Sequence, residues 1–216
     1  MKKTSPKRGS APRPNAGKRA ERSVASPVSS LRAWLGEGDL RSDGLANQVA
    51  ELLGQRPDLL PDLIDALNSE DPAARGHAAD ALEKVARTQP KEVMTYLPML
   101  IRAAQRDPVG MVRWHIAMTL GHLAIFPKSI PRALEALMEL LGDRNALVRS
   151  WAITSLCIIS RLYPVHTKLI VEATSPLCRD RSAAVAKRAR RAIELMTIPA
   201  LAFPKGWIKS GHIHSL

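Results

Sequence analysis

Aromatic residues and cysteines are scarce in this sequence of 216 residues, and long apolar runs are missing. Only 4% of the residues are aromatic, although 45% are hydrophobic. A core built from such residues is aliphatic, and the β-branched and aromatic runs that are typical of strands are absent. This composition favours an all-α fold.

The two cysteines, Cys157 and Cys178, are too few for a disulfide framework or a cysteine metal cluster. Both lie in apolar helical stretches, where we expect reduced core thiols. No apolar run approaches the roughly 18 residues of a membrane span, and no signal-peptide segment follows the basic start. The sequence therefore predicts a soluble, cytoplasmic protein with no membrane partner.

The net charge of +12 is concentrated at the two ends of the chain. Residues 1–30 carry eight Lys/Arg and one acidic residue, and residues 179–216 carry eight and two, whereas residues 31–178 are balanced. Residues 1–27 hold almost nothing apolar, so we expect a disordered basic tail. A transit peptide is the alternative, but the prolines in this stretch argue against the amphipathic helix that it needs.

A repeat of 36–37 residues runs through the balanced part of the chain. Its markers are four aspartates, each followed by a basic residue and, seven residues later, by a leucine. The aspartates are Asp71, Asp107, Asp143 and Asp180; the basic residues are Arg75, Arg113, Arg149 and Arg188; the leucines are Leu82, Leu120, Leu156 and Leu195. A period of this length with two helices per unit is typical of an α-solenoid.

This pattern resembles the HEAT-repeat family, most clearly at Val112-Arg113 and Val148-Arg149. The resemblance implies a right-handed α-α superhelix of about four helical hairpins, with a degenerate N-terminal cap. We expect the solenoid to span residues 28–197, with repeats at about 57–90, 91–127, 128–163 and 164–197. Its predicted helix pairs are 58–68 with 72–87, 92–106 with 109–125, 130–141 with 145–162, and 166–178 with 182–196.

The aspartates and basic residues have a structural interpretation. Each aspartate is placed to cap the second helix of its unit, and each basic residue can hydrogen-bond an aspartate of its own or the neighbouring unit. The predicted ladder contains Asp71, Arg75, Asp107, Arg113, Asp143, Arg149, Asp180 and Arg188.

Residues 198–216 are apolar but interrupted by Pro199 and Pro204, so neither a helix nor a disordered tail fits them. One interpretation is a strap over the exposed end of the last repeat. The other is a docking peptide anchored by Trp207, since aromatic anchors dominate binding hot spots.

A helical-wheel analysis predicts which side chains of the second helices point away from the core. Positions two, five and nine after the basic residue define a stripe on the concave surface. Its members are His77, Asp80, Lys84, His115, His122, Trp151, Thr154 and Arg190. Trp151 has two interpretations, recognition of a partner or packing between helices.

No catalytic, metal-binding or cofactor-binding motif is present in the sequence. The function that we expect is a non-catalytic scaffold that binds a protein partner on the concave stripe. The alternative is nucleic-acid binding by the basic tail and by the last helix, through Lys187, Arg188, Arg190 and Arg191.

Overall fold

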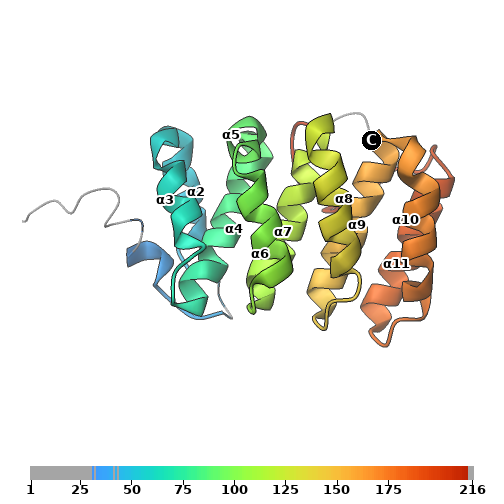
Figure 1. The fold of residues 1–216 in the computed structure, drawn as a ribbon, viewed down its shortest axis with the longest axis horizontal. Helices are drawn as coiled ribbons and strands as arrows, with labels where there is room; N and C mark the ends of the chain where they lie inside the picture. The colour runs from blue at the N-terminus through green and yellow to red at the C-terminus, as the bar shows by residue number, and fades with distance from the viewer. Residues whose placement is uncertain (1–30, 32, 41, 43, 214–216) are drawn as a thin grey trace, which may run out of the picture.

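The computed structural model describes residue 31, residues 33–40, residue 42 and residues 44–213. In this part of the chain every regular element is a helix, and the helices form hairpins stacked side by side in one row (Figure 1). The all-α repeat fold predicted from the sequence is thus confirmed. The predicted disordered tail, residues 1–27, lies outside the described residues.

Each repeat pairs a first helix with a longer second helix, and the first helices lie in front of the second helices in Figure 1. The first helices are α3, Leu60–Ala66; α6, Leu97–Arg106; α8, Ile130–Leu140; and α10, Thr167–Thr174. The second helices are α4, Pro72–Thr88; α7, Gly110–His122; α9, Ala146–Leu162; and α11, Ala183–Thr197. We call the surface formed by the second helices the inner face.

The N-terminal cap precedes the first repeat. Residues 33–35 are helical, and α2 follows at Ala46–Gln55. Val49 and Leu53 of α2 are fully buried, and α2 packs against α4. A short 3-10 turn, η1, connects α2 to α3 at Pro57–Leu59. The cap therefore shields the first apolar edge of the stack from water.

Prolines divide two first helices that the sequence analysis predicts as continuous. The predicted helix 92–106 is divided into α5, Pro90–Met94, and α6. Pro98 has no amide hydrogen to donate to the carbonyl four residues earlier, so the two helices are not continuous. The predicted helix 166–178 is reduced to α10, since Pro176 has the same defect. The flanking residues form 3-10 turns: η4, Pro164–His166, and η5, Ser175–Arg179. Two further 3-10 turns, η2 at Leu123–Ile125 and η3 at Pro127–Ser129, join α7 to α8.

The second helices supply the centre of the core. The four marker leucines have no exposed surface, and neither have the alanines three or four residues after each basic residue: Ala78, Ala79, Ala117, Ala152 and Ala192. Small residues let the second helices approach closely. At the contact of α7 with α9, a Cβ added to Gly121 would lie only 2.5 Å from Ser155 Oγ.

Arginine–aspartate pairs connect consecutive repeats. The Nε atom of each arginine donates to the aspartate of the following unit: Arg75 to Asp107 at 2.9 Å, Arg113 to Asp143 at 2.6 Å, and Arg149 to Asp180 at 2.8 Å. Each arginine also donates to a main-chain carbonyl before its own second helix, at Ser69, Asp107 or Asp143. These side chains are mostly buried, so the pairs are short charge-assisted bonds with little solvent screening.

The two ends of the predicted ladder differ from its middle. Asp71 caps α4 by accepting a hydrogen bond from the Ala73 amide, and no arginine of the described residues pairs with it. The assignment of Arg188 to the ladder is wrong. Among the described residues no aspartate pairs with it, and its guanidinium donates instead to Thr154 Oγ1 at 2.7 Å.

Residues 198–213, which we call the C-terminal segment, leave the end of α11 without forming a helix or strand. The segment first contacts α9, where Arg161 donates to the carbonyls of Pro199 and Leu201 at 2.9 and 3.0 Å. It then reaches α4 of the first repeat, where Ser210 Oγ donates to the carbonyl of Arg87 at 3.3 Å. The segment thus links the last repeat to the first across the inner face.

Candidate partner-binding surface

The predicted stripe lies on the inner face, but most of it is covered. The expectation of an open stripe is wrong for five members, which are at most 9% exposed: His77, Asp80, His115, His122 and Thr154. Lys84 and Trp151 are half-buried, and Arg190 is exposed. There are two physical reasons. Leu35, Asp39 and Ser42 lie on His77. The other four side chains bond side chains of a neighbouring second helix.

His77 holds the segment that precedes the repeats. Its Nδ1 atom lies 2.9 Å from the carbonyl oxygen of Leu35, and its Nε2 atom lies 3.1 and 3.2 Å from those of Asp39 and Ser42. A fully buried imidazole with these contacts fixes the N-terminal cap on α4. His77 is therefore a structural residue and not a surface for a partner.

Asp80 and His115 form a polar contact between α4 and α7. Asp80 accepts a hydrogen bond from Lys84 at 2.8 Å, and its second oxygen lies 3.5 Å from His115 Nε2. Burial lowers the pKa of His115 to about 4, and the opposing effect of the Asp80 charge is smaller. His115 is consequently neutral at physiological pH.

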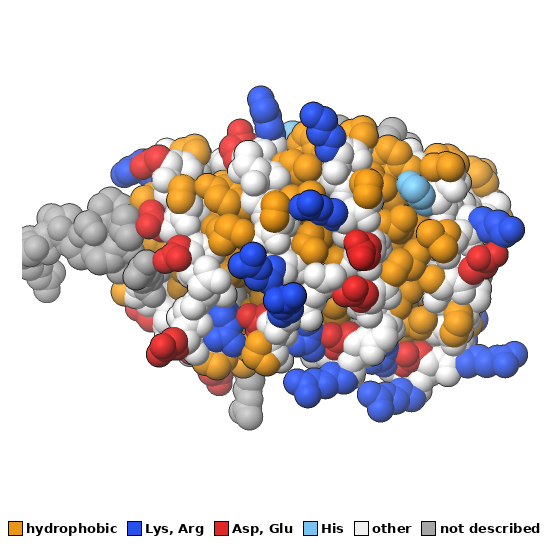
Figure 2. Space-filling view, in the orientation of Figure 1, with side chains coloured by type: hydrophobic (Ala, Val, Ile, Leu, Met, Phe, Trp, Pro, Cys, Tyr) orange, Lys and Arg blue, Asp and Glu red, His pale blue; other side chains and the backbone are white. Residues whose placement is uncertain are grey.

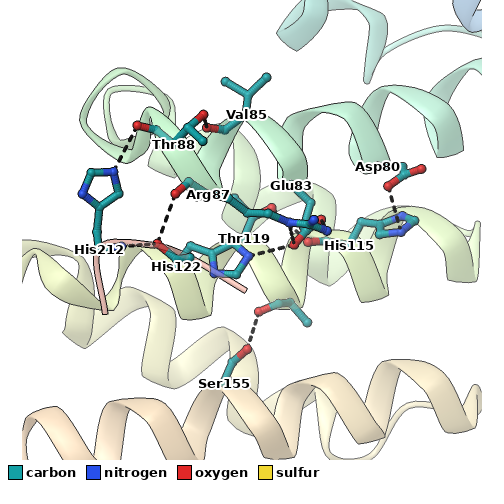
Figure 3. A network of polar contacts seen from close by, with 12 residues as sticks. Asp80, Glu83, Val85, Arg87, Thr88, His115, Thr119, His122, Ser155 and His212 are labelled. Carbon is teal, nitrogen blue, oxygen red and sulfur yellow. Dashed lines mark hydrogen bonds and ion pairs between the residues drawn. The ribbon is translucent and has the colours of Figure 1, made fainter. Parts of the chain in front are cut away.

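A second contact joins the same two helices one turn further on (Figure 3). Glu83 is fully buried, and it accepts hydrogen bonds from His122 Nε2 at 2.8 Å and from Arg87 Nε at 2.9 Å. Burial by itself would raise the pKa of Glu83, but the bonds from His122 and Arg87 outweigh it and lower the pKa to about 2. Glu83 is therefore ionised at physiological pH, and its charge is balanced by that of Arg87.

The helical-wheel analysis missed Glu83 and Arg87, which fall on neither the core positions nor the stripe. Their spacing of four residues on one helix was the available signal, because such pairs face each other.

The Nδ1 atoms of His115 and His122 are buried without a partner among the described residues. In this part of the chain no group of three His, Cys, Asp or Glu side chains is arranged to hold a metal ion.

A cluster of two tryptophans and two cations connects the last two repeats to the C-terminal segment. The guanidinium of Arg188 lies 5.0 Å from the ring centroid of Trp151 and 5.0 Å from that of Trp207. Lys209 Nζ lies 4.9 Å from the centroid of Trp151. Trp151 is thus half-buried by contacts with cations of both α11 and the C-terminal segment, in agreement with cation–π attraction.

The four cations proposed for nucleic acid lie on α11, and most of them have protein partners. Besides Arg188, Arg190 donates to the carbonyl of Cys178 at 2.6 Å, and Arg191 pairs with Glu194 at 2.9 Å. Lys187 is exposed. A hollow of about 300 Å³ brings several of these side chains together, since it is lined by Ala184, Lys187, Arg188, Arg191, Pro204 and Trp207.

Comparison with known proteins identifies the repeats. The family of HEAT repeats matches residues 60–157, which include α4, α7, most of α9 and the pairs Arg75–Asp107 and Arg113–Asp143. No curated protein matches the sequence.

Solved structures with the same fold include both engineered and natural proteins. An engineered protein has a TM-score of 0.60 and 23% identity, covering 79% of this chain and 81% of its own. The complex of CpcE and CpcF of phycocyanin lyase from Nostoc sp. PCC7120 has a TM-score of 0.61 and 24% identity, covering 76% and 96%. A designed armadillo repeat protein in complex with the peptide (KR)4 has a TM-score of 0.57 and 18% identity, covering 78% and 73%.

The helices of the repeat stack do not qualify as membrane spans. Within the described residues, none of them combines the length and the apolar character that crossing a bilayer requires.

Proposed function

We propose that this chain is a non-catalytic scaffold that binds an extended segment of a partner protein on its inner face. The observation that carries the proposal is the occupation of that face by an extended peptide, the C-terminal segment of the chain itself. Arg161 binds this peptide through two main-chain carbonyls, a mode of contact that depends little on the peptide's sequence.

An aromatic ring on the inner face supports a partner segment that carries a cation. Trp151 offers this ring, and Lys209 of the C-terminal segment already lies 4.9 Å from its centroid. A designed armadillo repeat protein with a similar fold is in complex with the peptide (KR)4, which is basic along its whole length. A surface of this fold with such a ring is suited to a peptide that contains lysine or arginine.

The side-chain chemistry supports binding over catalysis. Cys157 is a nucleophile by residue type, but it is fully buried, and burial raises the pKa of its thiol to about 12. The thiol is thus protonated at physiological pH, and the thiolate is the reactive form. The buried carboxylates of the inner face are used in pairs with His122, Arg87 and Lys84.

Site-specific photo-crosslinking in the source cells tests the proposal. A photoreactive amino acid replaces Lys187, which is exposed on α11 of the inner face, or Lys168, which is exposed on α10 of the same repeat but in the other layer. We expect a discrete protein adduct from position 187 and none from position 168. An adduct from position 168 alone, or from neither position, would contradict the proposal.

Nucleic-acid binding is the second candidate, favoured by the hollow that gathers Lys187, Arg188 and Arg191 beside Trp207. On the face of the molecule opposite to the inner face, basic and acidic side chains are interspersed among apolar ones, so no continuous basic surface is seen there (Figure 2).

A gel-shift titration against salt separates the two candidates. Binding that disappears steeply with salt, and also when residues 1–27 are deleted, would support nucleic acid; no binding at about 50 mM salt would leave the scaffold.

A further inference from the structure

We infer that residues 204–213 are a built-in competitor for the inner face, and that the partner segment has an aromatic side chain followed two residues later by a lysine. The inference rests on the proposed function and adds to it the chemistry of the partner and a means of regulation.

The side chains of the competitor make two specific contacts with the inner face. Trp207 stacks on the guanidinium of Arg188, which itself lies against Trp151. Two residues further on, Lys209 places its amine on the ring of Trp151. The aromatic side chain of the competitor thus contacts a cation of the repeats, and its cationic side chain contacts an aromatic ring of the repeats. Cation–π contacts of this kind are individually weak, so they select a peptide and still allow its exchange.

The ring of Trp151 selects a lysine at the second position. Lys209 Nζ lies 4.9 Å from the centroid of this ring, whose π-face attracts a cation and repels an anion. Burial lowers the pKa of Lys209; of the nearby charges, Glu83 and Asp80 raise it, whereas Arg87 and Lys84 lower it. The selectivity therefore comes from the aromatic ring that the repeats present.

The competitor lies on the surface more than in the core. Among residues 204–213 only Ser210 and Ile213 are buried, whereas Lys205, Lys209 and His212 are exposed. No helix or strand of the described residues includes this stretch, so its release breaks no ladder of backbone hydrogen bonds. Gly206 has a φ of +84°, which gives the chain a turn that L side chains rarely adopt. Release exposes Ile213 and breaks the hydrogen bonds of Ser210 and His212 to the carbonyls of Arg87 and Thr88.

The covalent connection between the competitor and the repeats determines how strongly the competitor reduces the affinity for a partner. A segment joined to its site by a short linker has an effective concentration in the millimolar range. A free peptide of the same chemistry must overcome this concentration, so binding to the intact chain is weak until the competitor is released. A partner that binds a second surface of the repeats at the same time would gain the same advantage.

A labelled peptide with the sequence of residues 201–213 tests the inference by fluorescence anisotropy. It is titrated with the full chain and with the double variant Trp207→Ala/Lys209→Ala, whose competitor lacks both contacts. We expect the variant to bind the peptide at least tenfold more tightly than the unaltered chain. A peptide with alanine at the positions of Trp207 and Lys209 should not bind the variant. Lys205→Ala is the matched control, because Lys205 is an exposed lysine of the same segment, and it should behave as the unaltered chain does.

Equal affinity of the variant and the unaltered chain, or no binding by a variant that is folded, would overturn the inference. The thermal midpoint of the double variant shows whether it is folded. If it is not, hydrogen exchange on the unaltered chain provides the test. An excess of the peptide should speed exchange of the amides of residues 205–213 and leave α4, α7 and α9 protected, and unchanged exchange would overturn the inference. An adduct from position 187 without peptide binding would leave the scaffold function standing and refute only the competitor.

Discussion

Glu83 of α4 accepts a hydrogen bond from His122 of α7 at 2.8 Å, and both side chains are at most 3% exposed. This pair joins the first two repeats at the inner face, in the layer where helix packing is otherwise aliphatic. Removing one partner of a buried ionic pair leaves the other uncompensated, which is more destabilising than the loss of a surface pair. The pair is therefore a sensitive point for the stability of the whole stack.

Glu83→Gln should lower the free energy of unfolding at pH 7 by about 3 kcal/mol. The carboxylate has a folded pKa of about 2, below its unfolded value of 4.5, so the stability it contributes is present above pH 4.5 and is lost as the pH falls towards 2. Urea denaturation of both proteins at pH 7, 4 and 3 measures the effect. The difference between them should shrink at the lowest pH, and a constant difference would contradict the assignment.

His115 should make the protein sensitive to acid in a higher pH range. Its folded pKa of about 4 lies below its unfolded value of 6.5, so the unfolded chain binds the proton first. The stability from the neutral imidazole is complete above pH 6.5 and decreases as the pH falls to 4, by about 3 kcal/mol. His115→Asn should flatten the dependence of unfolding free energy on pH between 7 and 4. A variant with the same slope as the unaltered chain would show that another group titrates there.

Arg113→Ala should destabilise the stack by about 3 kcal/mol, because Asp143 would remain mostly buried without its partner. Arg113→Lys should be intermediate, since an ammonium group cannot form the paired bonds of a guanidinium. Arg191→Ala is the control: its pair with Glu194 is solvent-exposed, and we expect a change within about 0.5 kcal/mol. Thermal or urea unfolding of the three variants distinguishes them, and equal losses for Arg113→Ala and Arg191→Ala would refute the role of the ladder.

Two glycines in helices should respond to alanine with opposite signs. At Gly121 the new Cβ would lie 2.5 Å from Ser155 Oγ and 3.3 Å from Ser155 Cα, so α7 and α9 must separate, at a cost of about 1–3 kcal/mol. At Gly54 no heavy atom lies within 4 Å of the added Cβ, and alanine should stabilise α2 by up to about 1 kcal/mol. Chemical denaturation of both variants measures the two signs, and a stabilised Gly121→Ala would show that the helices adapt.

The sequence predicts the repeats well because their signals are local. Leu82 and Leu120 recur at a fixed distance from an aspartate and an arginine, and each position follows from helical periodicity within one unit. The break between α5 and α6 was also readable from Pro98, although the apolar pattern on either side suggested one helix. Residues that are close in the chain thus decide most of the fold.

The covering of the inner face could not be read in the same way. Ser210 contacts Arg87 across 123 residues of sequence, and no periodic pattern connects the two positions. A helical wheel gives the direction in which His77 or His122 points, but not the segment that lies over it. Glu83 was missed for a related reason, because its partner His122 belongs to the next repeat and the pair has no motif of its own.

The link from the C-terminal segment to α4 has a consequence for biosynthesis. Repeat proteins in general can fold progressively, because each unit contacts only its neighbours. Here residues 198–213 follow all the repeats, so the contacts that cover Arg87 and Thr88 cannot form until every repeat has left the ribosome. During translation the carbonyls of Arg87 and Thr88 therefore stay uncovered at first, and for that interval a partner of the nascent chain would meet no competitor.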